Sequence, residues 1–433
     1  MHHPHSLPLP AARFCRSLLA FCVVTAFCLA PAGFCQKAGK KQNTLDAEQL
    51  LRENFDLAAR QYTLLLDTLK TSGAADTERC FPRTTKDGKL VTIRDRDWTS
   101  GFFPGSLWLL HEYTADAKWG DAARDYTARL EKLKDHTGTH DLGFMIGCSF
   151  GNGHRLTKDA AYRDIMLQGA RSLASRFNPF VGAIRSWDHG HWVFPVIIDN
   201  MMNLEFLLWA SRESGDPRYR EIAIRHAQTT LANHFREDGG SYHLVDFNPD
   251  TGAVIRRHTV QGYANSSAWS RGQAWGLYGF VVMYRETRQP AYLEQAQKIA
   301  FFLLNHNRLP ADKIPYWDFD APGIPNTPRD TAAAAIMASA LIELSDHTTD
   351  AKLAKWYLDT ARAQLLSLSS PAYRASAGEN GGFILMHATG HYPGLGEVDV
   401  PLNYADYYFL EALLRYRAKM SGQPVVPRPE NAK

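Results

Sequence analysis

The feature that most constrains this chain is a repeated pairing of helical segments. Between residues 45 and 420 the apolar residues recur at helical spacing, and no stretch sustains the alternation of a β-strand. Each repeat joins a nearly all-apolar helix to an amphipathic helix through a turn containing Gly, Asp or Pro. The segment 206–211 has almost no polar face, whereas the segment 219–227 keeps one. Because a helix that is apolar on all sides must be enclosed, the sequence predicts an inner and an outer layer of helices.

Six of these apolar helices follow an opening helix over 45–70. They begin at Gly101, Asp141, Asp199, Arg271, Asp330 and Asp406. The starts are about 40 to 76 residues apart, which is enough for two helices and their loops. This count predicts an all-α fold in which six helical hairpins close into a ring. The polar starts of the inner helices would then gather at one end of the ring, and we expect the functional site there.

Composition excludes several classes of protein. The chain has 433 residues, of which 45% are hydrophobic and 21% are charged, so it is neither disordered nor a polytopic membrane protein. Its net charge of +3 leaves no basic surplus for a nucleic-acid backbone, and no nucleic acid is expected as a partner. No obligate protein partner is evident from the sequence. The aromatic content of 12% is high, and aromatic rings suit both a core and stacking on sugar faces.

The two ends of the chain differ from the helical body. Arg13 and Arg16 precede an apolar run over 18–30, and small residues follow up to Ala32. The run is about 13 residues long, too short to span a membrane as a helix. We therefore expect a signal peptide over 1–32, an exported and periplasmic protein, and no membrane span once the leader is removed. A polar linker over 33–44, one helical domain over 45–420 and a Pro-rich tail over 421–433 complete the organisation.

Four acidic residues stand at starts of the predicted inner helices. Asp330 and Asp406 are expected to cap the N–H groups of their own helices. Asp199 lies between apolar neighbours, where the pKa of a carboxyl group should rise. A raised carboxyl group beside a second, ionised one performs acid and base chemistry on glycosides, and Asp141 is the natural partner. We therefore take Asp199 and Asp141 as the candidate catalytic pair.

The loops around this pair carry residues that can stack on a sugar ring or bind its carboxylate. They are Trp98, Trp187, His243, Gln261, Trp269, Arg271 and Trp275. His189 and His191 have no further metal ligands near them in the sequence, so no metal is predicted. The phosphate-binding, zinc-protease and nucleophile-elbow motifs are all absent from the sequence.

Several longer strings occur together and in order along the body. They are Asp97-Trp-Thr-Ser-Gly-Phe-Phe-Pro-Gly, His140-Asp-Leu-Gly-Phe, Ile197-Ile-Asp-Asn-Met-Met-Asn-Leu, Gln261-Gly-Tyr, Ser267-Ala-Trp-Ser-Arg-Gly-Gln-Ala-Trp-Gly, Tyr316-Trp-Asp-Phe-Asp and Asn403-Tyr-Ala-Asp-Tyr-Tyr. In these strings the chain resembles the unsaturated glucuronyl hydrolases of glycoside hydrolase family 88. The likeness extends over nearly all of residues 45–420.

The resemblance implies an (α/α)6 barrel and a catalytic domain that needs no cofactor. Its members remove the 4,5-unsaturated uronic acid from the non-reducing end of oligosaccharides that polysaccharide lyases leave behind, including those of glycosaminoglycans. They hydrate the C4=C5 double bond and do not attack the anomeric carbon. By the resemblance, Asp199 would protonate C4 and then help water to add at C5, while Asp141 would stabilise the developing charge. Thr259 joins the expected substrate-binding residues, and unsaturated uronate oligosaccharides are the expected partners.

The chain also departs from the family pattern. Val260 stands where another member has a His before the Gln-Gly motif, and the string from Leu385 to Tyr392 replaces a Ser-rich loop linked to sulfate preference. The sulfation preference is therefore open. His387, Thr389 and His391 are equally compatible with a leaving-sugar subsite and with a plain loop.

Three other functions stay open at this point. The related unsaturated rhamnogalacturonyl hydrolases have Arg-Gly-Asn-Gly-Trp where this chain has Arg271-Gly-Gln-Ala-Trp, which favours the glucuronyl group. An (α/α)6 epimerase would need acid–base histidines in place of the Asp pair. An inactive, exported sugar-binding (α/α)6 protein would bind ligands without consuming the double bond.

Overall fold

The computed structural model describes residues 32–426, with side chains from residue 46 on. The predicted signal peptide, apart from its last residue, and the end of the predicted tail over 427–433 lie outside the described residues. The segment 33–44, expected to be a linker, forms the first turns of helix α1 (Ala32–Thr71). In the part of the chain that the structure describes, no helix is long and apolar enough to cross a membrane.

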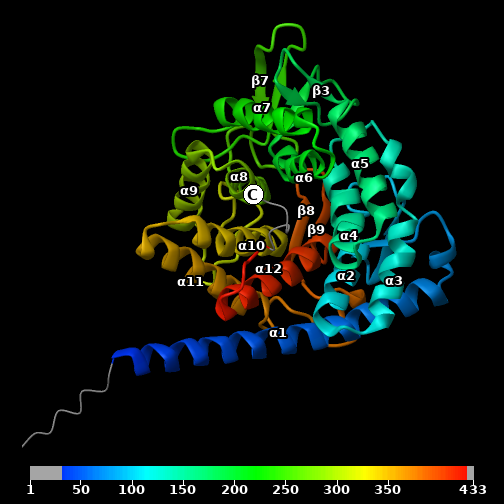
Figure 1. Cartoon of the computed structure of the whole chain (residues 1–433), viewed down its shortest axis with the longest axis vertical. Helices are drawn as coiled ribbons and strands as arrows, with labels where there is room; N and C mark the ends of the chain where they lie inside the picture. Colours follow the sequence, from blue (N-terminus) through cyan, green and yellow to red (C-terminus); the bar gives the residue numbers. More distant parts are fainter. Residues whose placement is uncertain (1–31, 427–433) are drawn as a thin grey trace, which may run out of the picture. The chain divides into compact units, whose positions relative to one another are not determined.

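The inner layer is a closed ring of helices, as the repeat predicted. Each inner helix contacts the next one, and the last contacts the first. In chain order the inner layer consists of α2 (Phe102–Thr114), a π-helix (Gly143–Gly151) that continues into α4 (Asn152–Thr157), a 3-10 turn (Ile198–Asn203) that continues into α6 (Leu204–Ser214), α8 (Ser270–Thr287), α10 (Thr331–His347) and α12 (Asn403–Ser421). Figure 1 shows α10 and α12 side by side within this layer. The all-α prediction and its six hairpins are confirmed.

Each of the first five inner helices is followed in the chain by an outer helix that packs against it. Its helices are α3 (Ala117–Ala128), α5 (Ala160–Ala174), α7 (Pro217–Asn233), α9 (Pro290–Asn305) and α11 (Ala351–Leu368). Helix α1 packs on α2 through two stacked ring pairs, Phe55 with Tyr113 and Tyr62 with Phe103. Four outer helices begin with an Asp whose side chain accepts a backbone N–H of the first turn, at Asp116, Asp159, Asp216 and Asp350.

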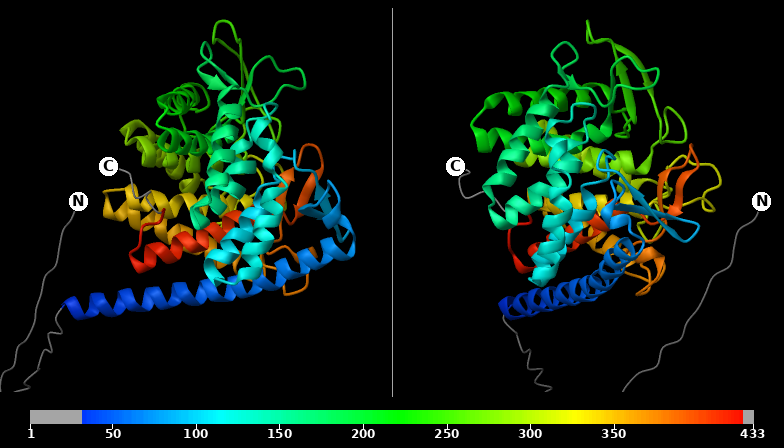
Figure 2. Two further views of the ribbon diagram at one scale, coloured as in Figure 1. Left: turned by 45° about the vertical axis from the view of Figure 1, so that its right-hand side comes forward. Right: turned by 90° about the vertical axis from the view of Figure 1, so that its right-hand side faces the viewer.

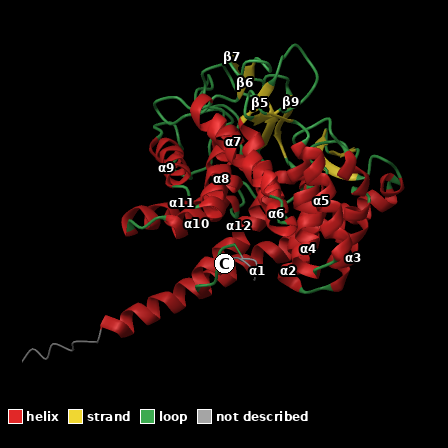
Figure 3. Ribbon diagram, turned by 45° about the horizontal axis from the view of Figure 1, so that its top comes forward, coloured by secondary structure: helices red, strands yellow, loops and turns green. Residues whose placement is uncertain are grey.

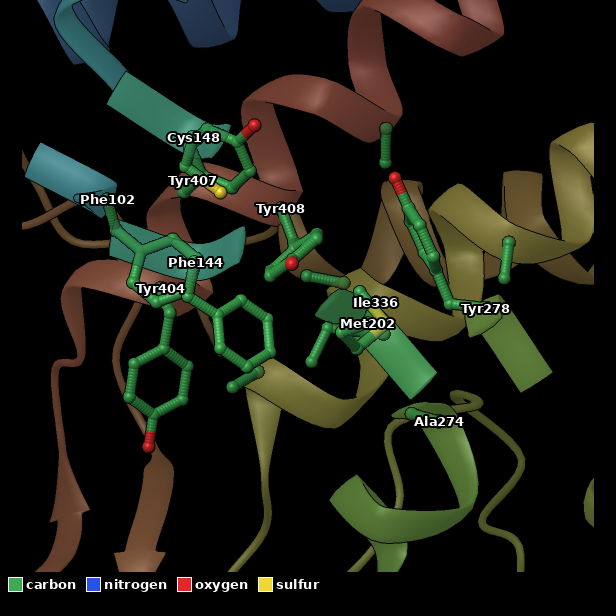
Figure 4. Close-up of a cluster of buried hydrophobic side chains, with 14 of the residues drawn as sticks. Phe102, Phe144, Cys148, Met202, Ala274, Tyr278, Ile336, Tyr404, Tyr407 and Tyr408 are labelled. Carbon is green, nitrogen blue, oxygen red and sulfur yellow. The ribbon is translucent and has the colours of Figure 1, made fainter. Parts of the chain in front are cut away.

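Two of the inner helices are buried around their whole circumference for most of their length. Every residue of α10 from Thr331 to Ser345 is buried, and so is every residue of α8 from Ser270 to Met283. Figure 4 shows the centre of the ring filled by side chains from all six inner helices, among them Phe102, Phe144 and Tyr408. Much of the aromatic excess therefore serves the core.

The helices approach one another very closely within this core. At Gly279 of α8 an added Cβ would lie 2.4 Å from the Cβ of Met201. Only glycine allows this contact between α8 and the 3-10 turn that precedes α6.

Nine short strands in the described residues were not anticipated from the sequence. They are β1 (Phe81–Lys86), β2 (Lys89–Ile93), β3 (Phe177–Asn178), β4 (Ala183–Ile184), β5 (Pro195–Ile197), β6 (Leu244–Phe247), β7 (Val254–His258), β8 (Ala388–His391) and β9 (Gly396–Val400). All pair antiparallel, in the order β5-β6-β7 and in three two-stranded sheets. With two to six residues each, they are too short to show a period of two in the sequence.

The strands lie in the long loops that lead into the inner helices. In the views of Figures 2 and 3 they gather along one side of the helical layers. This is the side at which the inner helices begin, so the loops collect where the site was expected.

Candidate active site

Ser186 holds the two candidate acids in one place. Its carbonyl oxygen accepts the N–H of His140 at 3.1 Å, next to Asp141. Its hydroxyl oxygen accepts the N–H of Ile197 at 3.0 Å and donates to Asn200, on either side of Asp199. Asp141 precedes the π-helix and Asp199 lies in the 3-10 turn before α6. The two inner-helix starts are thus joined by one residue of the loop between them.

Asp199 is a buried carboxyl group without a hydrogen bond at one of its oxygens. The Oδ1 atom of Asp199 has no hydrogen-bond partner among the described residues, and the Nε2 atom of His243 lies 3.9 Å from it. Burial raises the pKa of Asp199 to about 7, and the negative charge of Asp141 acts in the same direction. The Arg271 guanidinium opposes this rise. Asp199 can therefore hold a proton close to neutral pH, as its apolar neighbours predicted.

Asp141 is half-buried and is supplied with hydrogen-bond donors. The Thr139 hydroxyl donates to Oδ2 at 2.6 Å, and the Nε2 atom of His140 lies 3.2 Å from Oδ1. Burial raises the pKa of Asp141 to about 7, against the effect of the Thr139 hydrogen bond. Two interacting carboxyl groups share their titration. The donors favour the charge on Asp141 and leave the proton on Asp199, which is the division of roles that glycoside chemistry requires.

The hydrogen bonds of His243 fix its tautomer. Its Nδ1 atom accepts the backbone N–H groups of Val260 at 3.0 Å and Gln261 at 3.3 Å. A nitrogen that accepts two N–H groups carries no proton, so the proton of the neutral ring is on Nε2, the atom nearest Asp199. Burial lowers the pKa of His243 to about 3, with a further contribution from Arg271. His243 is therefore a neutral N–H donor throughout the physiological pH range.

His140 repeats this arrangement beside Asp141. Its Nδ1 atom lies 3.4 Å from the amide nitrogen of Asn203. The amide oxygen of Asn203 accepts the N–H of Phe144, which fixes the orientation of the amide group. Burial lowers the pKa of His140 to about 3. Each candidate acid thus faces the Nε2–H of a neutral imidazole.

Arg271 is fully buried and already bonded. Its Nη1 atom donates to Asp330 at 2.7 Å and to the Thr389 carbonyl at 2.5 Å, and Nη2 donates to the Gly390 carbonyl at 2.6 Å. Asp330 also accepts two backbone N–H groups of α10, so its predicted capping role is confirmed. The guanidinium lies over the Trp269 ring at 4.7 Å. Within the described structure, Nε is the one nitrogen of Arg271 without a hydrogen-bond partner.

The predicted tryptophans lie at different depths. Trp98 and Trp187 are half-buried, Trp98 against Phe144 and Trp187 stacked on His189. Trp269 is buried against the ring of His243, with ring centres 4.7 Å apart. Trp275 lies deeper still, in the core, between Phe144 and Tyr408. Its Nε1 atom has no partner in the described structure.

The loop after β7 carries Thr259 and Gln261, both partly exposed. The Thr259 hydroxyl accepts the N–H of Gly262, and the Gln261 amide donates to the Gly390 carbonyl at 3.2 Å. His391 reaches the same loop from β8, with its Nε2 atom 3.0 Å from the Val260 carbonyl oxygen. The loop after β7 and the β8–β9 hairpin are therefore joined beside the site.

The expected role of Asp406 is wrong. It lies inside α12, which begins at Asn403, and does not cap that helix. Its carboxylate instead accepts the N–H groups of Ile384 and Leu385, both at 2.9 Å. Because Asp406 is already in the first turn, its side chain reaches the loop before β8 and holds that loop to the ring.

Several residues of the site were missed in the sequence, among them Ser186, His140, Thr139 and Tyr404. Thr139 supplies the hydroxyl group on Asp141. Tyr404, in the first turn of α12, lies 5.3 Å below the Arg271 guanidinium, and its buried hydroxyl has no partner in the described structure. Tyr404 stands at the start of an inner helix, like the two acids, and this position was the available signal. Among the described residues no group of three or more His, Cys, Asp or Glu is arranged to hold a metal.

The chain matches known proteins over most of its length. The model of the family described as Glycosyl Hydrolase Family 88 matches residues 76–314. An unsaturated glucuronyl hydrolase of Formosa agariphila is 46% identical over 340 residues, which cover 77% of this chain and 84% of the relative. An unsaturated chondroitin disaccharide hydrolase of Streptococcus pyogenes is 33% identical over 87% of this chain and 93% of its own.

A solved structure gives the same result for the fold. The crystal structure of an unsaturated glucuronyl hydrolase specific for heparin superposes with a TM-score of 0.81 at 44% identity, and covers 88% of this chain and 100% of its own. The chain therefore belongs to glycoside hydrolase family 88, among its unsaturated glucuronyl hydrolases.

Proposed function

We propose that the protein removes the 4,5-unsaturated uronic acid from the non-reducing end of lyase-generated oligosaccharides, by hydration of the C4=C5 double bond. The observation that carries this proposal is the contrast between the paired acids. Asp199 is buried with one oxygen free of any partner, and Asp141 beside it has two donors. One acid holds a proton that it can deliver, and the other holds a negative charge that stabilises a cation.

The reaction begins with proton transfer from Asp199 to C4. The double-bond electrons form the new C4–H bond, and positive charge develops over C5 and the ring oxygen. The Asp141 carboxylate stabilises that charge. Water then adds to C5 and gives a proton to the Asp199 carboxylate, which restores the acid. The resulting hemiketal opens, and the partner sugar is released.

His243 would act at the moment when Asp199 becomes a carboxylate. Its Nε2–H already faces Asp199 Oδ1 at 3.9 Å and can shorten this distance to a hydrogen bond once the oxygen is charged. Because the pKa of His243 is lowered to about 3, the ring donates this bond without giving up its proton. His243 is thus a donor to the catalytic acid and not an acid itself.

The substrate class is proposed as glycosaminoglycan-type uronates. Relatives that match most of this chain include a hydrolase specific for heparin and one for chondroitin disaccharides. In this chain the carboxylate of the uronate would be bound by the local Arg271, since the net charge of +3 provides no broad basic surface.

The test is the absorbance of the unsaturated bond, followed with purified protein. Products of chondroitin, hyaluronan, heparin and ulvan lyases form the substrate panel. We expect the absorbance to fall with at least one uronate product while free partner sugar accumulates. Binding without loss of absorbance would contradict the proposal, and so would interconversion of sugars without cleavage.

We also propose that the protein is exported to the periplasm. The support is the leader over 1–32, with basic residues before a short apolar run and small residues after it. N-terminal sequencing of protein from the periplasmic fraction should begin after Ala32. Full-length protein confined to the cytoplasm would contradict export.

A further inference from the structure

A charged cavity lies near the proposed active site, and the proposed reaction does not use it. It has a volume of about 480 Å³ and lies between α5, the β3–β4 hairpin and the loop that carries Trp187. Its lining includes Arg176, Arg185, Phe177 and Phe194. The cavity therefore combines guanidinium groups with aromatic rings, which suits a charged group carried on a sugar.

Positive charge exceeds negative charge in this cavity. Arg176 and Arg185 both pair with Asp188, at 2.9 Å and 3.2 Å, and Asp188 is the one acidic residue among the described residues that line the cavity. Arg225 adds a third cation at the edge, where it donates to the Pro179 carbonyl and lies 5.3 Å over the Phe177 ring. Two guanidinium groups thus share one carboxylate, and a third lies at the edge of the cavity.

Arg176 and Arg185 differ in how many of their guanidinium nitrogens have hydrogen-bond partners. Arg176 donates through Nε to the Arg185 carbonyl at 2.8 Å and through its Nη atoms to Asp188 and the Thr137 carbonyl. Arg185 has one contact to Asp188, lies 5.9 Å over the Phe194 ring, and its buried Nε has no partner in the described structure. A buried donor without a partner is costly, so Arg185 is the group to which a ligand would add.

The cavity is connected to the catalytic pair through two short chain segments, 137–141 and 187–188. Thr139, which donates to Asp141, forms an isolated antiparallel bridge with Trp187. Thr137 and Asp188, which line the cavity, are two residues before Thr139 and one residue after Trp187. The positive charge of Arg176 also reaches Asp141, where it acts against the rise in pKa. A sugar chain that leaves the catalytic pair past Trp187 would therefore run towards this cavity.

We propose that the cavity is an anion subsite, in which Arg185 binds a sulfate or carboxylate group of the sugar chain on the leaving side of the cleaved linkage. The inference rests on the proposed function and deepens it. The subsite is separate from the β8–β9 hairpin, whose Thr389 and Gly390 carbonyls contact Arg271. With this subsite the enzyme prefers an oligosaccharide that carries a further sulfate or carboxylate group over an unsulfated unsaturated disaccharide.

The experiment compares Arg185→Gln with the unaltered protein on three substrates. These are an unsulfated unsaturated disaccharide, the corresponding tetrasaccharide with one more carboxylate, and a sulfated disaccharide. Loss of a charge-assisted contact should raise KM about tenfold for whichever of the two anion-bearing substrates uses the subsite, and leave KM for the unsulfated disaccharide unchanged. An effect on the tetrasaccharide alone identifies a carboxylate, and an effect on the sulfated disaccharide identifies a sulfate.

Two control variants separate local from general effects. Arg171→Gln removes the same charge from an exposed position on α5, outside the cavity lining, and should leave all three KM values unchanged. Arg185→Lys keeps the charge and should recover part of the affinity. Sodium chloride should raise KM for the preferred anion-bearing substrate in the unaltered protein and less in Arg185→Gln.

The inference is overturned if Arg185→Gln changes KM equally for all three substrates, or for none. An equal change marks a structural role for the Arg185–Asp188 pair, and no change marks an empty cavity. The three substrates come from a lyase product on which the unaltered protein acts. If it acts on no product of the panel, the proposed function fails instead, so the two failures are distinguishable.

Discussion

Two buried carboxyl groups at opposite ends of the inner ring, Asp199 and Glu343, have pKa values shifted in opposite directions. At the end where the inner helices begin, Asp199 has no cationic hydrogen-bond partner, and burial raises its pKa to about 7. At the other end, Glu343 of α10 lies between Arg285 and Arg415, each at 2.8 Å. The two guanidinium groups overcome burial and hold the pKa of Glu343 well below its usual range. Burial is common to both groups, and the partners decide the charge.

This difference assigns separate tasks to the two ends. Arg285 also pairs with Glu205 of α6, and Arg415 donates to the Tyr278 hydroxyl of α8, so the Glu343 network links four inner helices. At the loop end Asp199 has no cation within hydrogen-bond distance among the described residues, and Asp141 is held by the Thr139 hydroxyl and the His140 imidazole, so this pair remains able to exchange a proton. Chemistry is thus expected where charge is left uncompensated, and stability where it is matched.

The largest effect is expected for Asp199→Asn. An amide fits the same space but cannot protonate C4, so the loss of absorbance should slow by about 10³-fold or more. Folding should be little affected because the replaced group is already held neutral in the folded protein near pH 7. Initial rates and thermal unfolding of the same preparation test both statements. Near-normal turnover would show that Asp199 is not the acid.

The opposite pattern is expected for Glu343→Gln. Removal of this charge leaves two buried guanidinium groups without their carboxylate, which should reduce the free energy of unfolding by about 3 to 5 kcal/mol. Protein that remains folded should keep its kcat, since Glu343 is at the far end of the inner helices. Denaturant titration measures the loss of stability.

A control for this variant exists on α2. Glu112→Gln breaks the partly exposed pair with Arg155, at 2.6 Å, and should cost less than about 1 kcal/mol. If Glu343→Gln and Glu112→Gln are equally stable, the contrast between the two ends of the ring is wrong.

The ring of helices could be predicted because the sequence pattern that requires it occurs repeatedly along the chain. All-apolar helices of adequate length recur six times, and each needs enclosure by neighbours. The same reasoning located Asp199, since Ile197, Ile198 and Met201 around it are apolar and buried. The strands were missed because pairs of two to six residues depend on partners distant in the sequence.

The remaining differences arise from three-dimensional contacts. Asp406 looked like a cap because it precedes an apolar run, but the helix had already begun and the carboxylate binds a loop about 20 residues away in sequence. Thr139 carries no pattern that separates it from other polar residues, and Tyr404 has only its position at the start of an inner helix. The charge on Arg271 could be predicted, but not that Asp330, Thr389 and Gly390 already occupy its Nη atoms.

The raised pKa of Asp199 also predicts how activity depends on pH. Asp199 must be protonated to act, so kcat/KM should fall as pH rises above about 7. Asp141 raises the pKa of Asp199 through its negative charge. Asp141→Asn should therefore move this alkaline limb to lower pH and reduce kcat roughly a hundredfold through loss of charge stabilisation. A limb that stays in place in Asp141→Asn would show that the two acids do not interact.

The free energy of unfolding should also depend on pH through Asp141 and Asp199, because the pKa of each is raised in the folded protein. In the unfolded chain both acids ionise near their ordinary pKa of 3.8, whereas the folded pair keeps a proton, held mainly by Asp199, up to about pH 7. Between these values the folded state binds more protons, so the free energy of unfolding should decrease as pH rises from about 4 to 7. The decrease should be smaller in Asp199→Asn, which has one such group fewer. Equal slopes for the variant and the unaltered protein would contradict the raised pKa.

The smallest effect is expected at His243, and it tests whether the ring acts as a donor or as an acid. His243→Gln can retain an N–H near the position of Nε2, whereas His243→Phe cannot. The Phe variant should lose about tenfold in kcat, the value of one hydrogen bond to a charged group, and the Gln variant should lose less. Since the pKa of His243 is lowered to about 3 and its Nδ1 atom is occupied by two backbone N–H groups, neither variant should remove a limb from the pH–rate profile between pH 5 and 8. Loss of an acid limb in both variants would instead make His243 a titrating group, and the loop end of the ring would then contain two proton-transfer groups where the present geometry supports one.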